Sequence, residues 1–244
     1  MLQAIELTKR YEDNQLALDA LNLDIQAGEI FCLLGANGAG KTTTINLFLN
    51  FIEPTLGQLL IDGIDVVSNP LETKRHISYV SENVMLYGNF TARQNLDFFA
   101  KLGGKPHLTR DDYYAVLRNV GLQDEALEKK LKNFSKGMRQ KVGIAIAIIK
   151  DAPNVLLDEP TSGLDPKSAA ELMQILTQLR NRGKSILMCT HDIFRAKSIA
   201  DRVGIMKEGR MVMLRTRAQF QEDDLEQIYL DYMQQAVMDA QTVN

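Results

Sequence analysis

The sequence predicts an α/β fold: short strands come first, strands and helices alternate in the core, and a helical segment is inserted into it. An apolar run at residues 30–34 enters a glycine-rich segment that leads into a helical pattern. Strand and helix patterns alternate again from residue 151, whereas residues 88–150 show helical patterns alone. A chain of 244 residues that is 45% hydrophobic and 24% charged can bury a sizeable core.

The first third of the chain is expected to hold short strands around one helix. Apolar patterns predict strands at 2–7, 16–25, 30–34, 57–63 and 76–80. The helix is expected from Thr42 to about Asn50 and is ended by Pro54. The fourth strand closes on Asp62-Gly63, a dipeptide that favours a tight hairpin turn.

The inserted helices begin at a start signal. Residues 91–94, Thr-Ala-Arg-Gln, form a capping-box sequence, and apolar residues follow it at helical spacing. Further helical patterns cover 111–120, 124–132 and 136–150.

The alternation resumes in the last third. Strands are predicted at 154–157 and 185–190, and a hairpin at 203–207 and 211–214. Asp165 can cap a helix that has Pro166 at its first position and Gly183 just past its end. The tail predicts an amphipathic helix, expected to pack on the domain rather than bind a partner, with one apolar stripe made of Leu225, Ile228, Tyr229, Tyr232, Met233 and Ala236.

Net charge and cysteine usage narrow the class of protein. The net charge of −3 lacks the basic surplus that nucleic-acid binders usually show. No apolar run approaches the length that crosses a bilayer, so a membrane role is expected to come through a partner. Cys32 and Cys189 both lie in predicted strands and are expected to be buried, reduced thiols.

The segment from Gly35 to Thr42 fits the pattern G-x-x-x-x-G-K-[ST] between a strand and a helix. Glycine permits positive φ, so successive N–H groups can face an anion, and the following helix adds its N-terminal dipole. Lys41 is expected to reach the β- and γ-phosphates, and the Thr42 hydroxyl to ligate Mg²⁺. The alternative is a glycine-rich turn with a chance lysine. The predicted nucleotide-binding residues of this segment are Gly35, Ala36, Asn37, Gly38, Ala39, Gly40, Lys41, Thr42 and Thr43.

A second motif lies at the end of the strand that begins at Asn154, where two carboxylates follow an apolar run. Asp158 at the strand tip is expected to hold Mg²⁺ beside Thr42. Glu159 is expected to point elsewhere and to polarise a water for attack on the γ-phosphate. Without the phosphate loop upstream, the pair could equally be a surface turn.

Residues 134–138, Phe-Ser-Lys-Gly-Met, resemble the signature motif of the ATP-binding-cassette (ABC) ATPases, which is usually Leu-Ser-Gly-Gly-Gln. On its own this stretch could be an ordinary serine-capped helix. Residues 162–165, Ser-Gly-Leu-Asp, resemble the D-loop of that family, and His191 ends a strand as the switch histidine does. Tyr11 precedes the phosphate loop, where the family stacks an aromatic ring on adenine.

This resemblance implies a P-loop NTPase (RecA-like) core with an N-terminal antiparallel β subdomain and an inserted α-helical subdomain, within one ABC ATPase domain at residues 2–233. The core with its β subdomain would occupy 2–87 and 151–215, the helical subdomain 88–150, and a helical tail 216–244. The resemblance also implies a head-to-tail dimer, formed by two copies or with a related cassette.

In such a dimer, Ser135, Lys136 and Gly137 of one subunit would contact the ATP held by the other. His191 would act with Glu159 in catalysis, together with Lys41, and Asp165 would communicate across the dimer. The implied cofactors are ATP and Mg²⁺.

Three positions, in two motifs, depart from the family pattern. A glutamine usually follows the strand at 76–80, and here Glu82 is the residue that would ligate the metal or position water. Lys136 replaces a glycine and Met138 a glutamine, variants that resemble cassettes paired with ABC-2-type membrane subunits.

The resemblance therefore implies the ATP-hydrolysing subunit of an ABC transporter, working towards export at the cytoplasmic face of the plasma membrane. A separate transmembrane permease would dock near residues 82–95, where Met85, Leu86 and Tyr87 are either exposed or part of a capped, buried loop. The main alternative is a soluble ABC ATPase acting on nucleic acid or ribosomes, which the single cassette and the charge disfavour. A P-loop kinase or regulatory module is disfavoured by the signature, the D-loop and His191.

Overall fold

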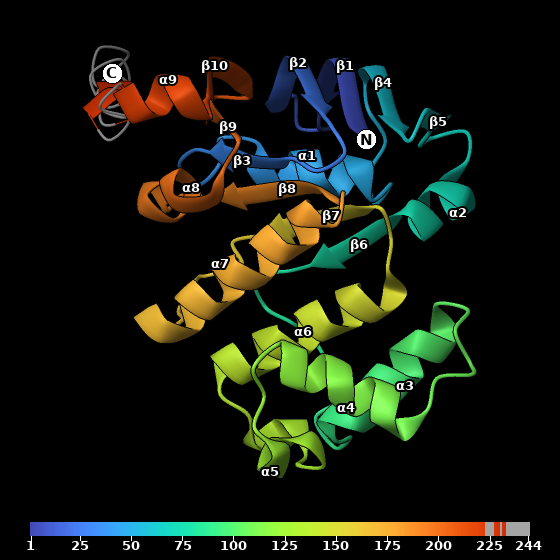
Figure 1. Ribbon diagram of the computed structural model, residues 1–244. Helices are drawn as coiled ribbons and strands as arrows, with labels where there is room; N and C mark the ends of the chain where they lie inside the picture. The colour runs from blue at the N-terminus through green and yellow to red at the C-terminus, as the bar shows by residue number, and fades with distance from the viewer. Residues whose placement is uncertain (223–226, 230, 233–244) are drawn as a thin grey trace.

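The computed structural model describes residues 1–222, 227–229 and 231–232, and Figure 1 shows a sheet-rich core joined to a lobe of helices. The strands are β1 Leu2–Arg10, β2 Leu16–Ile25, β3 Ile30–Leu34, β4 Leu56–Ile61, β5 Ile64–Asp65, β6 Ile77–Val80, β7 Asn154–Asp158, β8 Ser185–Thr190, β9 Arg202–Lys207 and β10 Arg210–Thr216. The α-helices are α1 Lys41–Phe48, α2 Pro70–Thr73, α3 Ala92–Leu102, α4 Arg110–Asn119, α5 Asp124–Leu127, α6 Lys136–Lys150, α7 Pro166–Asn181, α8 Ile193–Ile199 and α9 Arg217–Glu222.

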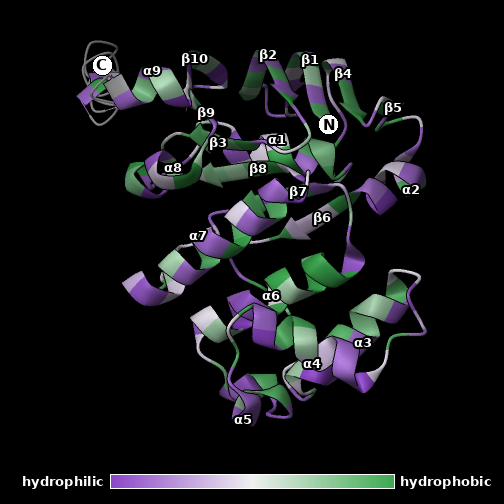
Figure 2. Ribbon diagram, viewed as in Figure 1, coloured by the Kyte–Doolittle hydropathy of each residue, from purple (hydrophilic) through white to green (hydrophobic). Residues whose placement is uncertain are grey.

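The central sheet has the strand order β10-β9-β3-β8-β7-β6. Its strands run parallel except β10, which pairs antiparallel with β9 around the turn Glu208-Gly209. All residues of β3, β7 and β8 are buried, as expected of parallel strands covered on both faces. Figure 2 shows the hydrophobic colouring of β8. The carboxyl ends of these strands therefore meet at one edge of a rigid sheet.

Alternation along β3 sends side chains into two cores. Phe31 and Leu33 join a core shared with α1 and the N-terminal strands, while Cys32 and Leu34 join the core under α7 and α8. The N-terminal strands form a separate antiparallel sheet of order β2-β1-β4-β5. As predicted, its last hairpin turns on Asp62-Gly63, where both residues have positive φ.

The helical lobe comprises α3 to α6. The predicted capping box at Thr91 is present, and Thr109 makes a second one at the start of α4. The helix expected at 124–132 is wrong beyond Leu127. Lys130 is extended there and forms a bridge with Thr91, so pairing with a distant segment replaces the helix.

The expected stop of the first helix at Pro54 is also wrong. Helix α1 ends at Phe48, because Asn50 takes a left-handed conformation with φ 50° that cannot continue a helix. In the tail, Ile228, Tyr229 and Tyr232 pack against the larger core, whereas Leu225, Met233 and Ala236 lie outside the described residues.

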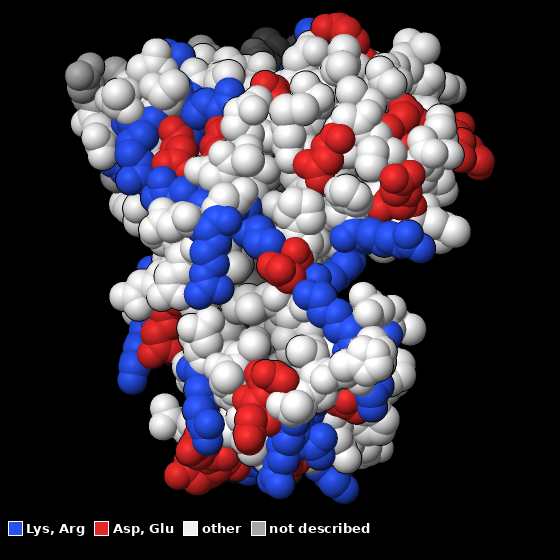
Figure 3. Space-filling view, turned by 45° about the vertical axis from the view of Figure 1, so that its right-hand side comes forward, with Lys and Arg blue, Asp and Glu red and all other residues white. Residues whose placement is uncertain are grey.

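The surface view shows acidic and basic side chains interspersed on one face, which is hollowed between the core and the helical lobe (Figure 3). In the described part of the chain, no helix is long and apolar enough to cross a membrane. Both cysteines are free and fully buried, as predicted. Burial raises the pKa of the Cys32 and Cys189 thiols.

Candidate functional site

The phosphate loop joins β3 to α1 and depends on two glycines that lie close to neighbouring backbone. A Cβ on Gly35 would lie 2.6 Å from the carbonyl oxygen of Met206, and one on Gly40 would lie 2.7 Å from that of Ala17. Gly40 also has φ 109°, a conformation that side chains rarely permit, and it leads directly into α1 at Lys41. The loop thus ends on a helix N-terminus, which favours an anion.

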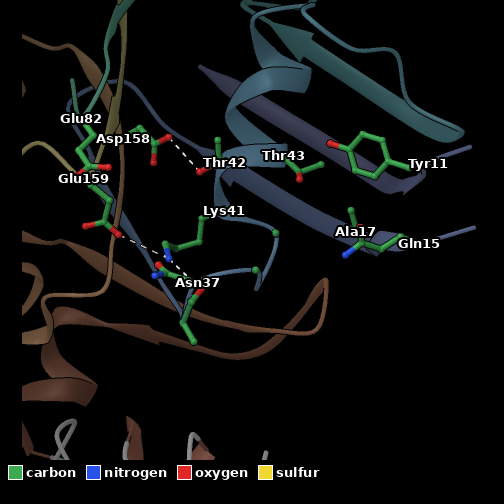
Figure 4. A pocket seen from close by; sticks show the side chains of 13 residues that line it. Tyr11, Gln15, Ala17, Asn37, Lys41, Thr42, Thr43, Glu82, Asp158 and Glu159 are labelled. Atoms are coloured by element: carbon green, nitrogen blue, oxygen red, sulfur yellow. Dashed lines mark hydrogen bonds and ion pairs between the residues drawn. The ribbon is translucent and has the colours of Figure 1, made fainter. Parts of the chain in front are cut away.

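The Lys41 ammonium lies inside this loop, and the residue is only 5% exposed. It donates hydrogen bonds to the carbonyl oxygens of Gly35 at 2.6 Å and Ala36 at 3.1 Å. Its nearest carboxylate is Glu159, whose Oε1 is 3.7 Å from Nζ (Figure 4). A buried cation held by carbonyls can exchange them for the stronger acceptors of a phosphate.

Thr42 and Asp158 meet across the floor of the site, where the Thr42 hydroxyl donates to Asp158 Oδ2 at 3.1 Å (Figure 4). The other carboxylate oxygen, Oδ1, is buried without a hydrogen-bond partner. Burial is the main cause that raises the pKa of Asp158, with the nearby charge of Glu159 adding to it. An unsatisfied buried carboxylate oxygen beside a hydroxyl is a donor set that suits a hard cation.

Glu159 leaves the strand in a left-handed conformation, with φ 45°. Its carboxylate accepts from the Thr190 hydroxyl at 3.1 Å and lies 3.0 Å from His191 Nδ1, both at Oε2. The two carboxylates contact different partners, but the expectation that Glu159 points elsewhere is not met. Both still line the same pocket, because the turn at Glu159 interrupts the side-to-side alternation of the strand.

One pocket gathers most of the predicted nucleotide site. It is lined by Tyr11, Gln15, Ala17, Ala36, Asn37, Gly38, Gly40, Lys41, Thr42, Thr43, Glu82, Asp158 and Glu159. Tyr11 lies across from the phosphate loop in Figure 4, on the side of the N-terminal sheet. The sequence analysis did not find Gln15 and Ala17, although both lie within six residues of Tyr11 and could have been sought there.

The signature and D-loop residues cap helices outside this pocket lining. Ser135 accepts from the backbone N–H of Met138 at the start of α6. Asp165 accepts from the Ser168 N–H and hydroxyl at the start of α7. Gly137, in the first turn of α6, lies close to the first turn of α7, since a Cβ there would be 3.3 Å from Ser168 Oγ.

Glu82 and His191 occupy different margins of the site. Glu82 lines the pocket, where it accepts from the Ser162 hydroxyl at 2.7 Å, a contact that sequence analysis missed. The side chain of His191 is 60% exposed, and its Nδ1 lies 3.0 Å from Glu159 Oε2. Among the described residues, no group of three or more His, Cys, Asp and Glu side chains could hold a metal on its own.

Comparison with known proteins identifies the family. The sequence profile described as ABC transporter matches residues 18–162, more than half of the chain. The chain belongs to the ABC transporter family. It is 38% identical to the bacitracin transport ATP-binding protein BcrA of Bacillus licheniformis over 87% of this chain and 68% of that protein. It is 34% identical to the ABC transporter ATP-binding protein NatA of Bacillus subtilis over 87% of this chain and 88% of the relative.

Solved ABC structures share the fold. An ATP-binding subunit of an ABC transporter superposes with a TM-score of 0.83 at 30% identity, covering 95% of this chain and 98% of the other. A dimeric ATP-binding cassette in a post-hydrolysis state with ADP and Pi gives 0.80 at 28% identity, covering 89% and 99%. The predicted P-loop NTPase core with its antiparallel β subdomain and helical insertion is confirmed. This ABC protein is an ATP-binding, ATP-hydrolysing transporter subunit.

Proposed function

We propose that this ABC subunit powers export through a separate ABC-2-type permease, by closing as a head-to-tail dimer on ATP and reopening after hydrolysis. The observation that carries the proposal is the division of the site. The phosphate loop and both carboxylates share one pocket, while Ser135 and Gly137 lie outside its lining. A second cassette, identical or related, would bring its own signature residues to that pocket.

Within the pocket, Lys41 would bind the β- and γ-phosphates and the loop N–H groups the remaining oxygens. Thr42 and Asp158 fit Mg²⁺, with Glu82 as a further ligand directly or through water, and the ion would neutralise phosphate charge when bound. Tyr11 would stack on adenine. Asp165 would meet the partner cassette.

Glu159 would act as the general base for the attacking water. Its Oε1 is buried without a hydrogen-bond partner, while Oε2 is already occupied by Thr190 and His191. Oε2 is thus held in place, whereas Oε1, which lies 3.7 Å from Lys41 Nζ, has no hydrogen-bond partner and would accept the proton from water. His191 would orient this carboxylate and reach the γ-phosphate.

Exposed aromatic side chains in α3 and in the loop before it support docking of a membrane partner where the core meets the helical lobe. Tyr87 lies 5.1 Å from Phe90 and 5.0 Å from Phe98 between ring centroids, and all three are more than a third exposed. Met85, two residues before Tyr87 in the chain, is 87% exposed. An adjoining groove between the core and this lobe is lined by Ser78, Tyr79, Phe99, Leu102, Gly103, Ile146, Ala147 and Lys150. An apolar cytoplasmic segment of a permease would cover this surface.

The export direction is supported by relatives whose names include linearmycin resistance and Nod factor export. The choice of an ABC-2-type partner rests on the signature variants Lys136 and Met138. Such a subunit would sit at the cytoplasmic face of the plasma membrane, held there by the permease.

Co-purification from detergent-solubilised membranes of its source tests the proposal. We expect a polytopic membrane protein to accompany the tagged wild type and the Leu71→Asp control, which changes a 78% exposed leucine on α2. Met85→Asp is expected to lose that protein. Recovery only with ribosomes or nucleic acid would reject the transporter proposal in favour of a soluble ABC ATPase.

A further inference from the structure

Two of the residues that depart from the family pattern, Glu82 and Lys136, lie side by side in one chain. The Lys136 ammonium is 3.7 Å from Glu82 Oε1, the same oxygen that accepts from the Ser162 hydroxyl at 2.7 Å. Three segments therefore meet at this oxygen. Glu82 lies in the loop after β6, Lys136 is the first residue of α6, and Ser162 lies in the loop after β7.

The lysine also packs against the loop after β7. A Cβ on Gly163 would lie 3.4 Å from both Cδ and Nζ of Lys136, so the stem of the lysine lies over this glycine. Gly163 has φ 67°, which further restricts the position to a residue without a side chain. The lysine stem is thus confined on one side, while its ammonium reaches Glu82 on the other.

The charge of Glu82 needs such a partner once a nucleotide binds. Glu82, Asp158 and Glu159 line one pocket, and Lys41 is the lysine among the described residues that line it. A triphosphate adds several negative charges to the same space. Lys136 does not line the pocket, so its ammonium can offset the charge of Glu82 without occupying the space of the nucleotide.

We propose that Lys136 is a positioning residue that, with Ser162, fixes the Glu82 carboxylate at the pocket rim and offsets its charge against the incoming nucleotide. The inference rests on the proposed function, since it assigns Glu82 to the metal and water side of the ATP site. Residue 136 would then serve two ATP sites. Its backbone would face the ATP bound by the partner subunit, and its side chain would position Glu82 beside the ATP bound by its own subunit.

A double-mutant cycle in the full-length protein tests this, with KM and kcat for MgATP measured at low and high salt. We expect Lys136→Met to raise KM roughly two- to fivefold at low salt, the range of a half-exposed ion pair, with a smaller change in kcat. Lys136→Arg should restore the wild-type KM. In Glu82→Gln, whose amide oxygen can still accept from Ser162, the same Lys136→Met change should have little effect on KM.

The exposed Lys129, on the same lobe, provides the control for a lost positive charge, and Lys129→Met is expected to behave as wild type. If Lys136→Met raises KM equally in the wild type and in the Glu82→Gln background, or if arginine fails to rescue, the inference is overturned while the ATPase remains. If the wild type itself neither binds nor hydrolyses MgATP, the proposed function fails as well.

Discussion

At the residue scale, Glu159 combines a strained backbone with a carboxylate whose two oxygens differ: Oε2 contacts Thr190 and His191, and Oε1 has no hydrogen-bond partner. A left-handed conformation in a non-glycine residue costs of the order of 1 kcal/mol, and such costs persist where function requires the geometry. We expect Glu159→Gln to lower kcat about 10²–10⁴-fold, because the amide cannot accept the proton from water.

The same variant should hold ATP in a closed dimer, since binding is preserved while hydrolysis stops. Light scattering of Glu159→Gln with MgATP would then show twice the mass of the monomer. The wild type would not accumulate this dimer, because it hydrolyses the ATP. A wild-type hydrolysis rate in Glu159→Gln would remove the role of general base.

Tyr11 lines the pocket opposite the phosphate loop, and Lys9 Nζ lies 5.3 Å from its ring centroid. If the ring stacks on adenine, Tyr11→Ala should weaken ATP binding while leaving kcat nearly unchanged, because the contact is equal in ground and transition states. Tyr11→Phe is the control that keeps the ring and should bind as wild type. Calorimetric titration would refute the stacking role if alanine left the affinity unchanged.

We predict that the ionised Asp158 carboxylate, which would bind the metal, lowers the free energy of unfolding of the nucleotide-free protein. Because burial raises its pKa above the usual 3.8, the folded state binds a proton more tightly than the unfolded chain, and stability falls as pH rises through the raised pKa. In the nucleotide-free protein, ionisation of this carboxyl is therefore less favourable in the folded state than in the unfolded chain. Asp158→Asn should raise the Tm of the nucleotide-free protein by a few degrees at pH 7 and abolish the further rise given by MgATP.

Asp65 supplies the opposite case for the same measurement. Backbone hydrogen bonding from Ser68 is the main cause that lowers its pKa, so its ionised form stabilises the fold above the usual pKa. Asp65→Asn should therefore lower Tm at pH 7 and leave the MgATP effect intact. If both variants shifted Tm in the same direction, the burial argument for Asp158 would be wrong.

At the scale of elements, one buried amide joins the loop before α3 to the helix itself. Asn95 is 0% exposed, accepts from the Tyr87 N–H at 3.0 Å and donates to the carbonyl oxygens of Tyr87 and Thr91. Asn95→Ala leaves these groups unpaired, and we expect a loss of roughly 1–3 kcal/mol in the free energy of unfolding.

Amide hydrogen exchange should also accelerate through residues 81–90 in this variant. Gln94→Ala, which removes an exposed capping-box partner of Thr91, is the control on the adjacent position. Equal acceleration in both variants would show that the effect is general fraying of α3 rather than release of the loop.

Elements with a strong local signal were predictable, and those fixed by distant partners were not. The phosphate loop, the Asp165 cap and the Asp62-Gly63 turn follow from residues a few positions apart. The short α5 does not, because Thr91 pairs with Lys130 across the lobe. In the site, the carboxylate pair was visible in sequence, whereas the Ser162–Glu82 and Thr190–Glu159 contacts arise only when separate loops meet at one sheet edge.

At the scale of the whole molecule, the divided site predicts complementation. Lys41→Ala spoils a phosphate loop, and Ser135→Asp should repel the partner's nucleotide while still capping α6, because aspartate is a good N-cap. Each variant alone should be inactive. Mixed in equal amounts they should regain part of the ATPase activity, because a mixed dimer holds one intact phosphate loop facing one intact signature.

Thr109→Asp makes the same kind of substitution at the cap of α4, away from the proposed site, and should hydrolyse ATP as wild type. A mixture that stays inactive although native mass spectrometry detects mixed dimers would refute the head-to-tail arrangement.

The burial of both thiols has a practical consequence for observing such a dimer. Cys32 and Cys189 are 0% exposed and hold their protons tightly, so maleimide reagents at neutral pH should leave them unmodified. A single cysteine placed at exposed Leu71 would then carry a spin label or fluorophore in an otherwise native background. The distance between two such labels in a dimer would report opening and closing directly, without first replacing Cys32 and Cys189 in the core.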